Sequence, residues 1–385
     1  MKNLIHKLGK AKIDQTSINA SVDIQKINNL FLFNKEKIEF FLKKNKKEEI
    51  KILWKIFFKK GYFNFPINKS IEIYIINNFK NLKKIFNYIN FRYLFHLCGS
   101  KKINIGYPPH LLIEPVSTCN LRCPFCFQTD KTFTLKPFMG VMEFNFFKKI
   151  VDEADQLGIG AVTLASRGEP TLHKNLKDML KYLGMKKNIH EIKLNTNATF
   201  LSIELIHEIF KNKISQVVIS ADHYEKEKFE KLRKNSNFEK IVNNVDNLYK
   251  IRENYTHTNT EIRISGIEFN ENIDKEKFHQ FWIKRSDHVT LGKALERWDT
   301  YNNSIDEKIN DPCETLWDRM YVWFDGKVNP CDADYKSYLS YGNLKENSIK
   351  EVWQSNIINK TRCAHLNNER KNIDPCNKCG ITFIK

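Results

Sequence analysis

The chain has 385 residues, a formal net charge of +18, 28% charged residues and 41% hydrophobic residues. A prior of roughly 150 residues per domain predicts two or three domains with a sizeable core. The lysines are spread through nearly every segment rather than gathered in one basic stripe, which argues against a nucleic-acid partner. No segment approaches the ~20 consecutive apolar residues that a membrane helix needs.

The nine cysteines indicate the compartment and a class of ligand. The first residues lack the continuous apolar segment and cleavage site of a secretory signal, so we expect a cytoplasmic protein. Because the cytosol keeps thiols reduced, we expect these cysteines to bind metal rather than to form disulfides.

The spacing of apolar residues divides the chain into three parts. Residues 1–105 have helix-like spacing over 37–58 and 70–91, which predicts a small helical N-terminal domain. Between residues 106 and 304, short apolar runs alternate with amphipathic stretches, the pattern of a parallel α/β sheet. Six such β–α units make a partial (β/α)6 barrel of the TIM type, short of the full eight. The expected strands are 111–117, 161–166, 191–197, 216–222, 261–266 and 288–294.

Amphipathic segments between these strands predict the helices of the barrel. Residues 305–385 no longer alternate in this way, and we expect a separate C-terminal module there. An Asp-Gly turn predicts a hairpin over 322–331, and one helix is expected over 348–366. The expected barrel helices are 140–158, 175–187, 202–212, 238–254 and 274–286.

Three cysteines follow the first expected strand with the spacing C-x3-C-x2-C: Cys119, Cys123 and Cys126. In a parallel barrel, the carboxyl ends of the strands carry the chemistry. Three thiolates on a short loop can hold three irons of a [4Fe–4S] cluster and leave the fourth iron open. A structural zinc site takes four closed ligands, and no fourth Cys or His lies nearby in the sequence.

This spacing, with Phe125 before the last cysteine, resembles the signature of the radical S-adenosylmethionine (SAM) superfamily over residues 111–300. The resemblance implies that the open iron binds SAM and that an electron from the cluster cleaves it to a 5′-deoxyadenosyl radical, which abstracts hydrogen from the substrate. An acidic electron donor such as flavodoxin or ferredoxin is then the expected partner. The basic surface would attract such a donor, or a phosphorylated small-molecule substrate, by electrostatic steering.

Further segments resemble the SAM-binding motifs of that family and occur in the same order along the chain. The tripeptide that contains Glu169 is similar to its Gly-Glu-Pro motif, which implies that this carboxylate accepts the methionine amino group. The segment after the third strand is similar to Thr-Asn-Gly, with Ala198 where glycine is usual. The cofactor-binding residues implied by the resemblance are Phe125, Gly168, Glu169, Pro170, Asn197, Ser220, Asp222 and Arg233.

A second set of four cysteines, in the C-terminal part, is enough to saturate one further cluster. With the hairpin, they resemble the twitch module, a shortened relative of the SPASM domain, which implies one auxiliary [4Fe–4S] cluster and two clusters in all. A zinc ribbon would use four thiolates equally well. We expect Cys98 to be a buried apolar residue, whereas Cys363 could replace one ligand. The four expected ligands are Cys313, Cys331, Cys376 and Cys379.

Candidate substrate residues are Arg297 and Asp299, which follow the sixth strand, and Arg167, which precedes the Gly-Glu-Pro motif. An arginine can bind a phosphate or carboxylate, and an aspartate can deprotonate an alcohol. The alternative is a structural Arg–Asp pair that closes the barrel onto the C-terminal module.

The leading hypothesis is dehydrogenation of a sugar or cyclitol alcohol, with the auxiliary cluster as electron acceptor, because related enzymes with one auxiliary cluster carry out this chemistry. One alternative is maturation of a ribosomally made peptide, with residues 1–105 binding its leader. Another is epimerisation, with Cys98 or Cys363 as hydrogen donor. A cluster carrier or a nucleic-acid binder would not require Glu169, Asn197 and Asp222 around an open iron. The sequence does not name the substrate.

Overall fold

The computed structural model describes residues 24–33, 35–44, 69–255, 258–269, 273–294, 299–305 and 310–379. Within these residues, nine strands form one sheet in the order β6-β5-β4-β3-β2-β1-β7-β8-β9. The first six strands are parallel to their neighbours and confirm the partial-barrel fold class. They are β1 (His110–Ile113), β2 (Ala161–Leu164), β3 (Glu191–Thr196), β4 (Gln216–Ser220), β5 (Glu261–Glu268) and β6 (His288–Lys293).

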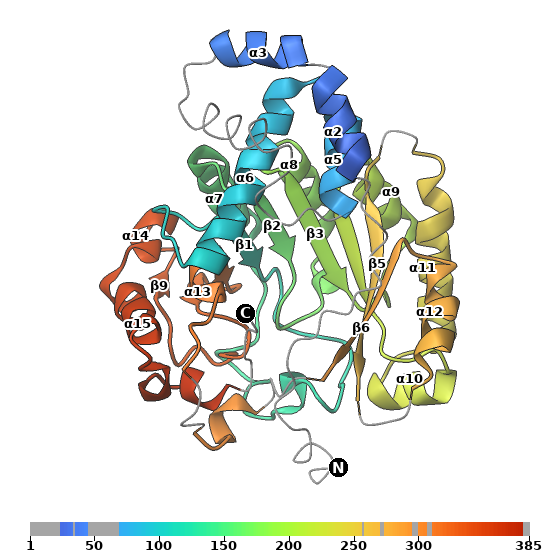
Figure 1. The fold of residues 1–385 in the computed structure, drawn as a ribbon. Coiled ribbons are helices and arrows are strands. Elements are labelled where there is room, and N and C mark those ends of the chain that lie inside the picture. The colour runs from blue at the N-terminus through green and yellow to red at the C-terminus, as the bar shows by residue number, and fades with distance from the viewer. Residues whose placement is uncertain are drawn as a thin grey trace.

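Helices cover the outer face of this sheet (Figure 1). Strand residues such as Leu164, Leu194 and Ile219 are fully buried and pack with apolar helix residues in one core. The five barrel helices are where the amphipathic patterns predict them. One short helix, α10 (Lys226–Leu232), was not predicted. The predicted helices are α7 (Phe144–Leu157), α8 (Leu176–Gly184), α9 (Ile203–Lys211), α11 (Phe238–Arg252) and α12 (Lys275–Ile283).

The N-terminal helices lie at the end of the barrel where the strands begin, at the top of Figure 1. They are α2 (Ile24–Phe33), α3 (Lys35–Lys44), α5 (Lys69–Asn78) and α6 (Leu82–Lys101). The helix expected over 70–91 is divided because the side chain of Asn81 caps the start of α6. Residues 45–58 of the other expected helix lie outside the described residues. The Phe91 ring packs directly on Gly160, where a Cβ atom would lie 2.2 Å from the ring.

The C-terminal module is joined to the barrel rather than separate from it. Strand β7 (Met320–Val322) pairs in parallel with β1, and β8 (Lys327–Asn329) and β9 (Gly342–Asn343) add antiparallel strands. The hairpin is therefore present, but it extends the barrel sheet. The boundaries expected near residues 105 and 304 stay predictions.

The single helix expected over 348–366 is two helices. The first, α14 (Ile349–Trp353), begins with a capping box at Ser348 and ends before Ser355, where α15 (Asn356–Leu366) starts. Helix α13 (Thr315–Asp318) precedes the hairpin. None of the described helices is long and apolar enough to cross a membrane. Short 3-10 turns lie at Phe127–Thr129, Pro170–Leu172, Thr300–Asn302, Arg370–Asn372 and Cys376–Lys378.

A buried ion pair fixes the carboxyl ends of β1 and β2 to the C-terminal module. Glu114 follows β1 and is fully buried, and Arg167 follows β2 and is 3% exposed. The Nε and Nη2 atoms of Arg167 donate to the two oxygens of Glu114, each at 2.6 Å. Its Nη1 donates to the carbonyl of Tyr335 at 2.7 Å. We call these three residues the clamp.

We predict that Arg167→Met strongly destabilises the protein, because it leaves the Glu114 carboxylate buried without its partner. Loss of one member of a buried ion pair costs about 3–5 kcal/mol. The free energy of unfolding in urea measures this loss. Arg285→Met is the matched control, since Arg285 pairs with Asp246 on the surface, where both side chains are partly exposed. An equal loss of stability in the two variants would contradict a special role for the clamp.

Candidate cluster and cofactor site

The three cysteines of the first set lie together on the loop that follows β1. The Cys119 sulfur accepts a hydrogen bond from the backbone N–H of Leu121 at 3.4 Å, and the backbone N–H of Cys126 donates to the Cys123 carbonyl at 3.0 Å. Burial, with a smaller contribution from the neighbouring thiols, raises the pKa of Cys119 to about 11 and that of Cys126 to about 12. Bound iron would stabilise the thiolates against this burial.

Gly168 allows the Gly-Glu-Pro loop to lie directly on the chain that leads to the cysteines. A Cβ atom at this position would lie 2.2 Å from the carbonyl oxygen of Val116 and 2.5 Å from that of Thr118. The backbone N–H of Glu169 donates to the same Thr118 carbonyl at 2.9 Å. A larger residue would therefore displace the cysteine loop, and Pro170 then starts a short 3-10 turn.

Glu169 connects the carboxyl ends of β2 and β3. Its carboxylate accepts hydrogen bonds from the hydroxyl of Thr196 at 2.6 Å and from the backbone N–H of Asn197 at 2.7 Å. Burial raises the pKa of Glu169, and these hydrogen bonds oppose the rise. The Asn197 amide nitrogen lies 3.9 Å from the sulfur of Cys119. The structure thus places three of the predicted residues next to one another.

Ala198 lies at the turn position where the family that the sequence resembles usually has glycine. Its φ of 63° is in the left-handed region, and its side chain is fully buried. A left-handed conformation costs a residue with a Cβ atom about 1–2 kcal/mol. The side-chain amide of Asn244 donates to the Ala198 carbonyl at 2.8 Å. The turn is therefore formed in spite of the missing glycine.

Asp222 and Arg233 form a buried pair beside the cysteine loop. Arg233 Nη2 lies 2.8 Å from Asp222 Oδ2, while Oδ1 accepts from the backbone N–H of Ile267. Burial raises the pKa of Asp222, and the Arg233 charge opposes this rise. The same guanidinium lowers the pKa of Cys123, which burial raises. Ser220 is half-buried on β4, and the ribose contacts expected of Ser220 and Asp222 stay predictions.

Phe125 stacks on Phe269, which follows β5, with the ring centres 4.2 Å apart. Sequence reasoning identified the first ring and missed the second. It also missed Gln128, whose side-chain nitrogen donates to the carbonyls of Ser117 and Arg167 at 2.7 and 2.6 Å. The only sequence signal for Gln128 was its position two residues after Cys126, the last cysteine of the first set.

The four C-terminal cysteines line one small cavity, together with Asp334 and Arg370. Burial raises the pKa values of Cys313 and Cys331, and the neighbouring thiols add to the rise. Within the described residues, no three His, Cys, Asp or Glu side chains converge closely enough to hold a single metal ion. Four thiols on one cavity fit an iron–sulfur cluster by donor chemistry. Cys98 is fully buried, as expected, and Cys363 is exposed on α15.

The two cysteine regions pack against each other through the segment after Cys331. The ring of Tyr335 stacks on Phe127 with centres 5.0 Å apart, and its hydroxyl donates to Asp130 at 3.0 Å. Burial alone would raise the pKa of Asp130, but hydrogen bonds, first among them that from Lys336, hold it to about 2. A continuous packed contact therefore links the first cysteine loop to the second.

The three residues predicted to contact the substrate have different positions in the structure. Arg297 lies outside the described residues. The carboxylate of Asp299 accepts from the side chain of Asn302 at 2.8 Å, at the start of a 3-10 turn. The catalytic roles of Arg297 and Asp299 stay predictions. Arg167 belongs to the clamp, and its guanidinium is bound by Glu114 and Tyr335. The structural Arg–Asp pair expected as the alternative stays a prediction, because Arg297 is not described.

Comparison with known proteins agrees with this geometry. Residues 113–272 match the radical SAM superfamily, and residues 313–380 match the SPASM iron–sulfur cluster-binding domain. An uncharacterized protein of Methanocaldococcus jannaschii is 29% identical over 212 residues, 52% of this chain and 64% of that protein. The chain thus spans less than two thirds of that relative.

A cysteine-type anaerobic sulfatase-maturating enzyme of Clostridium novyi is 26% identical over 326 residues, 70% of this chain and 84% of that enzyme. The solved structure of anSMEcpe with bound AdoMet shares the fold, with a TM-score of 0.53 and 19% identity over 70% of this chain and 88% of that one. The radical SAM domain implies a [4Fe–4S] cluster and SAM, and the SPASM domain implies further clusters. The chain therefore belongs to the radical SAM superfamily and carries a C-terminal SPASM-type iron–sulfur domain.

Proposed function

We propose that this enzyme oxidises a C–H bond of its substrate by using two clusters with different tasks. The observation that carries the proposal is the difference between the two cysteine sets. The three cysteines on the loop after β1 would leave one iron of a [4Fe–4S] cluster open, whereas the four cysteines that line the C-terminal cavity would be enough to bind every iron of a second one. SAM bound at the open iron supplies a one-electron cleavage whose product takes a hydrogen atom from carbon.

The residues of the barrel bind and orient SAM in this proposal. Cys119, Cys123 and Cys126 hold the cluster, and Glu169 offers its carboxylate to the methionine ammonium group. A carboxylate makes charge-assisted hydrogen bonds to such a group. Its position is fixed by Thr196 and Asn197, so little reorganisation is needed when SAM binds.

The four C-terminal cysteines would hold the second cluster, which would supply the acceptor for the electron that remains on the substrate after hydrogen abstraction. Loss of this electron and of one proton leaves the substrate oxidised by two electrons in all. The packed contact between Phe127 and Tyr335 supports this role, since it holds the two cysteine regions against each other. Each turnover then needs one electron for SAM cleavage. An acidic donor such as flavodoxin or ferredoxin suits the net charge of +18.

Two substrate classes fit this reaction. A sugar or cyclitol alcohol is the candidate that the sequence favours, with Asp299 as the base for the hydroxyl proton. A peptide or protein side chain is supported by the similarity to a sulfatase-maturating enzyme over 84% of its length. Deuterium transfer into 5′-deoxyadenosine distinguishes the two substrate classes. One reaction contains perdeuterated cyclitols and sugars, and the other contains perdeuterated peptides. Transfer from neither mixture would contradict both candidates.

We predict that Cys119→Ala, Cys123→Ala and Cys126→Ala together abolish the formation of 5′-deoxyadenosine under strong reductant. The C-terminal cluster should keep its visible absorbance, because its four cysteines are unchanged. Iron analysis should fall from about eight irons per chain to about four, as follows from two four-iron clusters. Continued cleavage of SAM would contradict the assignment of the first cluster. Finding four irons and one zinc in the parent protein would contradict the assignment of the second cluster.

A further prediction separates SAM cleavage from substrate oxidation. In Cys376→Ala/Cys379→Ala, strong reductant should still yield 5′-deoxyadenosine, whereas oxidised product should fall at least tenfold because the electron acceptor is lost. Cys363→Ala is the matched control, since this cysteine is exposed on α15 and should leave both yields unchanged. Circular dichroism and SAM binding verify folding. A folded variant with parental product yield would show that the second cluster is structural.

We also predict that Glu169→Gln weakens SAM binding while the fold is kept. The amide retains the shape of the side chain but loses the charge that attracts the ammonium group. Hydrogen bonds to charged groups contribute about 1.5–3 kcal/mol, so the dissociation constant of SAM should rise at least tenfold. Equilibrium dialysis with labelled SAM measures it. Unchanged affinity in a variant of parental melting temperature would remove Glu169 from the SAM site.

A further inference from the structure

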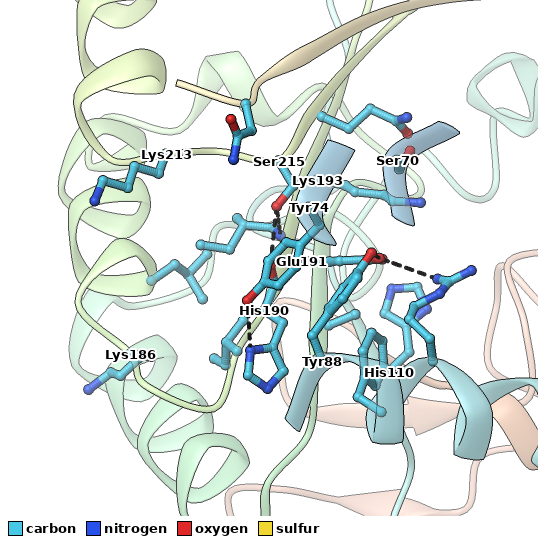
Figure 2. A pocket seen from close by; sticks show the side chains of 18 of the residues that line it. Ser70, Tyr74, Tyr88, His110, Lys186, His190, Glu191, Lys193, Lys213 and Ser215 are labelled. Atoms are coloured by element: carbon cyan, nitrogen blue, oxygen red, sulfur yellow. Dashed lines mark hydrogen bonds and ion pairs between the residues drawn. The ribbon is translucent and has the colours of Figure 1, made fainter. Parts of the chain in front are cut away.

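A cavity of about 330 Å³ lies at the opposite end of the barrel from the cysteines. Figure 2 shows its lining, which comes from the starts of β3 and β4, the loops beside them and the N-terminal helices α5 and α6. Since the strands are parallel, this end is one strand length away from the cluster loops. Cavities of ~300–1,000 Å³ accommodate small molecules. The reaction proposed above does not use this cavity.

Two lysines, Lys84 and Lys213, belong to the lining of this cavity. The ammonium group of Lys84 donates to the side-chain oxygen of Asn78 at 2.8 Å. Burial lowers the pKa of Lys84, and the charge of Lys213 lowers it further. A third lining lysine, Lys186, is already bound to the carboxylate of Asp152 at 2.5 Å. Lys84 and Lys213 therefore repel each other where an anion would bring them together.

The backbone conformation of Lys213 is unusual for a lysine. Its φ of 54° is left-handed, and it lies two residues after the end of α9. Glycine or asparagine is usual in this conformation at a helix end, and another residue costs about 1–2 kcal/mol. A lysine therefore stands at a position where glycine or asparagine would be less strained.

The wall of the cavity is suited to the uncharged part of a ligand. Tyr74 stacks on Tyr88 with ring centres 3.7 Å apart, which offers a flat apolar surface. Gln216 is 7% exposed, and its Oε1 has no hydrogen-bond partner among the described residues. Its amide nitrogen donates to Glu261 at 2.9 Å, which fixes the orientation of that oxygen. A ligand hydroxyl would satisfy the buried acceptor.

The described lining of the cavity holds two carboxylates, Glu191 and Glu261, against seven lysine and arginine side chains, so its net charge still attracts an anion. Glu191 accepts from the hydroxyl of Tyr88 at 2.7 Å and pairs with Arg92 at 3.3 Å. One oxygen of Glu261 accepts from Ser70 at 2.6 Å, while the other lies 3.7 Å from His288 and has no hydrogen-bond partner among the described residues. Burial lowers the pKa of His190 to about 4, so this ring is neutral near pH 7 and adds no charge.

We propose that this cavity binds a small organophosphate, with the phosphate between Lys84 and Lys213 and a hydroxyl-bearing body against Gln216 and the ring of Tyr74. The ligand would be held far from the clusters, so it serves as an effector or a stabilising ligand rather than as the oxidised substrate. A ligand that binds the folded state alone raises its stability by mass action.

Calorimetric titration of the reconstituted enzyme at low ionic strength tests this proposal. Saturating SAM is present, so that the cluster end is occupied. The probes are inorganic phosphate, glucose 6-phosphate and glucose. The test variant is Lys84→Ala/Lys213→Asn, in which asparagine suits the left-handed position. The control variant is Lys181→Ala/Lys211→Ala, which removes two exposed lysines of α8 and α9 that do not line the cavity.

We expect one saturable site per chain for both phosphates, with glucose 6-phosphate tighter than inorganic phosphate and glucose weakest. The dissociation constants should rise at least tenfold in the test variant and less than twofold in the control. Added salt should weaken binding, since exposed charges are screened. Equal weakening in the two variants would mean diffuse attraction to a basic surface and would overturn the site. Absence of saturable phosphate binding, or glucose 6-phosphate no tighter than phosphate, would also overturn it.

Discussion

The buried pair of Glu114 and Arg167 is the interaction on which the arrangement of the two cysteine regions depends. Each residue ends a neighbouring barrel strand, and the guanidinium also binds the carbonyl of Tyr335, four residues after Cys331. Removal of either charge would leave the other buried without its partner, which strongly destabilises the folded state. The first cysteine loop, the Gly-Glu-Pro loop and the C-terminal module therefore have one fixed relation to one another.

This fixed relation gives the barrel two ends with different chemistry. At the carboxyl end, Glu169 and Asn197 lie against the first cysteine loop, and Tyr335 stacks on Phe127 of that loop. At the other end, helices α5 and α6 cover the barrel and its starting strands supply charged side chains such as Glu191. The cysteine loops and the cavity at this other end thus lie a strand length apart.

The alternation of apolar segments was enough to predict the six barrel strands, because each is a short local pattern. The four C-terminal cysteines that the family resemblance implied as ligands line one cavity, and their binding of a cluster stays a prediction. The clamp was not predicted, since Glu114 and Arg167 are 53 residues apart and Tyr335 is 168 residues further on. Addition of β7 to β1 was missed for the same reason, because three-residue strands carry almost no periodicity.

The central claim is that one cluster has an open iron and the other is fully bound by protein. Electron paramagnetic resonance of the reduced enzyme, recorded with and without SAM, tests it most directly. We predict two overlapping cluster signals, of which SAM shifts one and leaves the other unchanged. A Cys376→Ala/Cys379→Ala sample should retain the shifted signal and lose the unchanged one. Signals that both respond to SAM, or that both ignore it, would contradict the division of roles between the two cysteine sets.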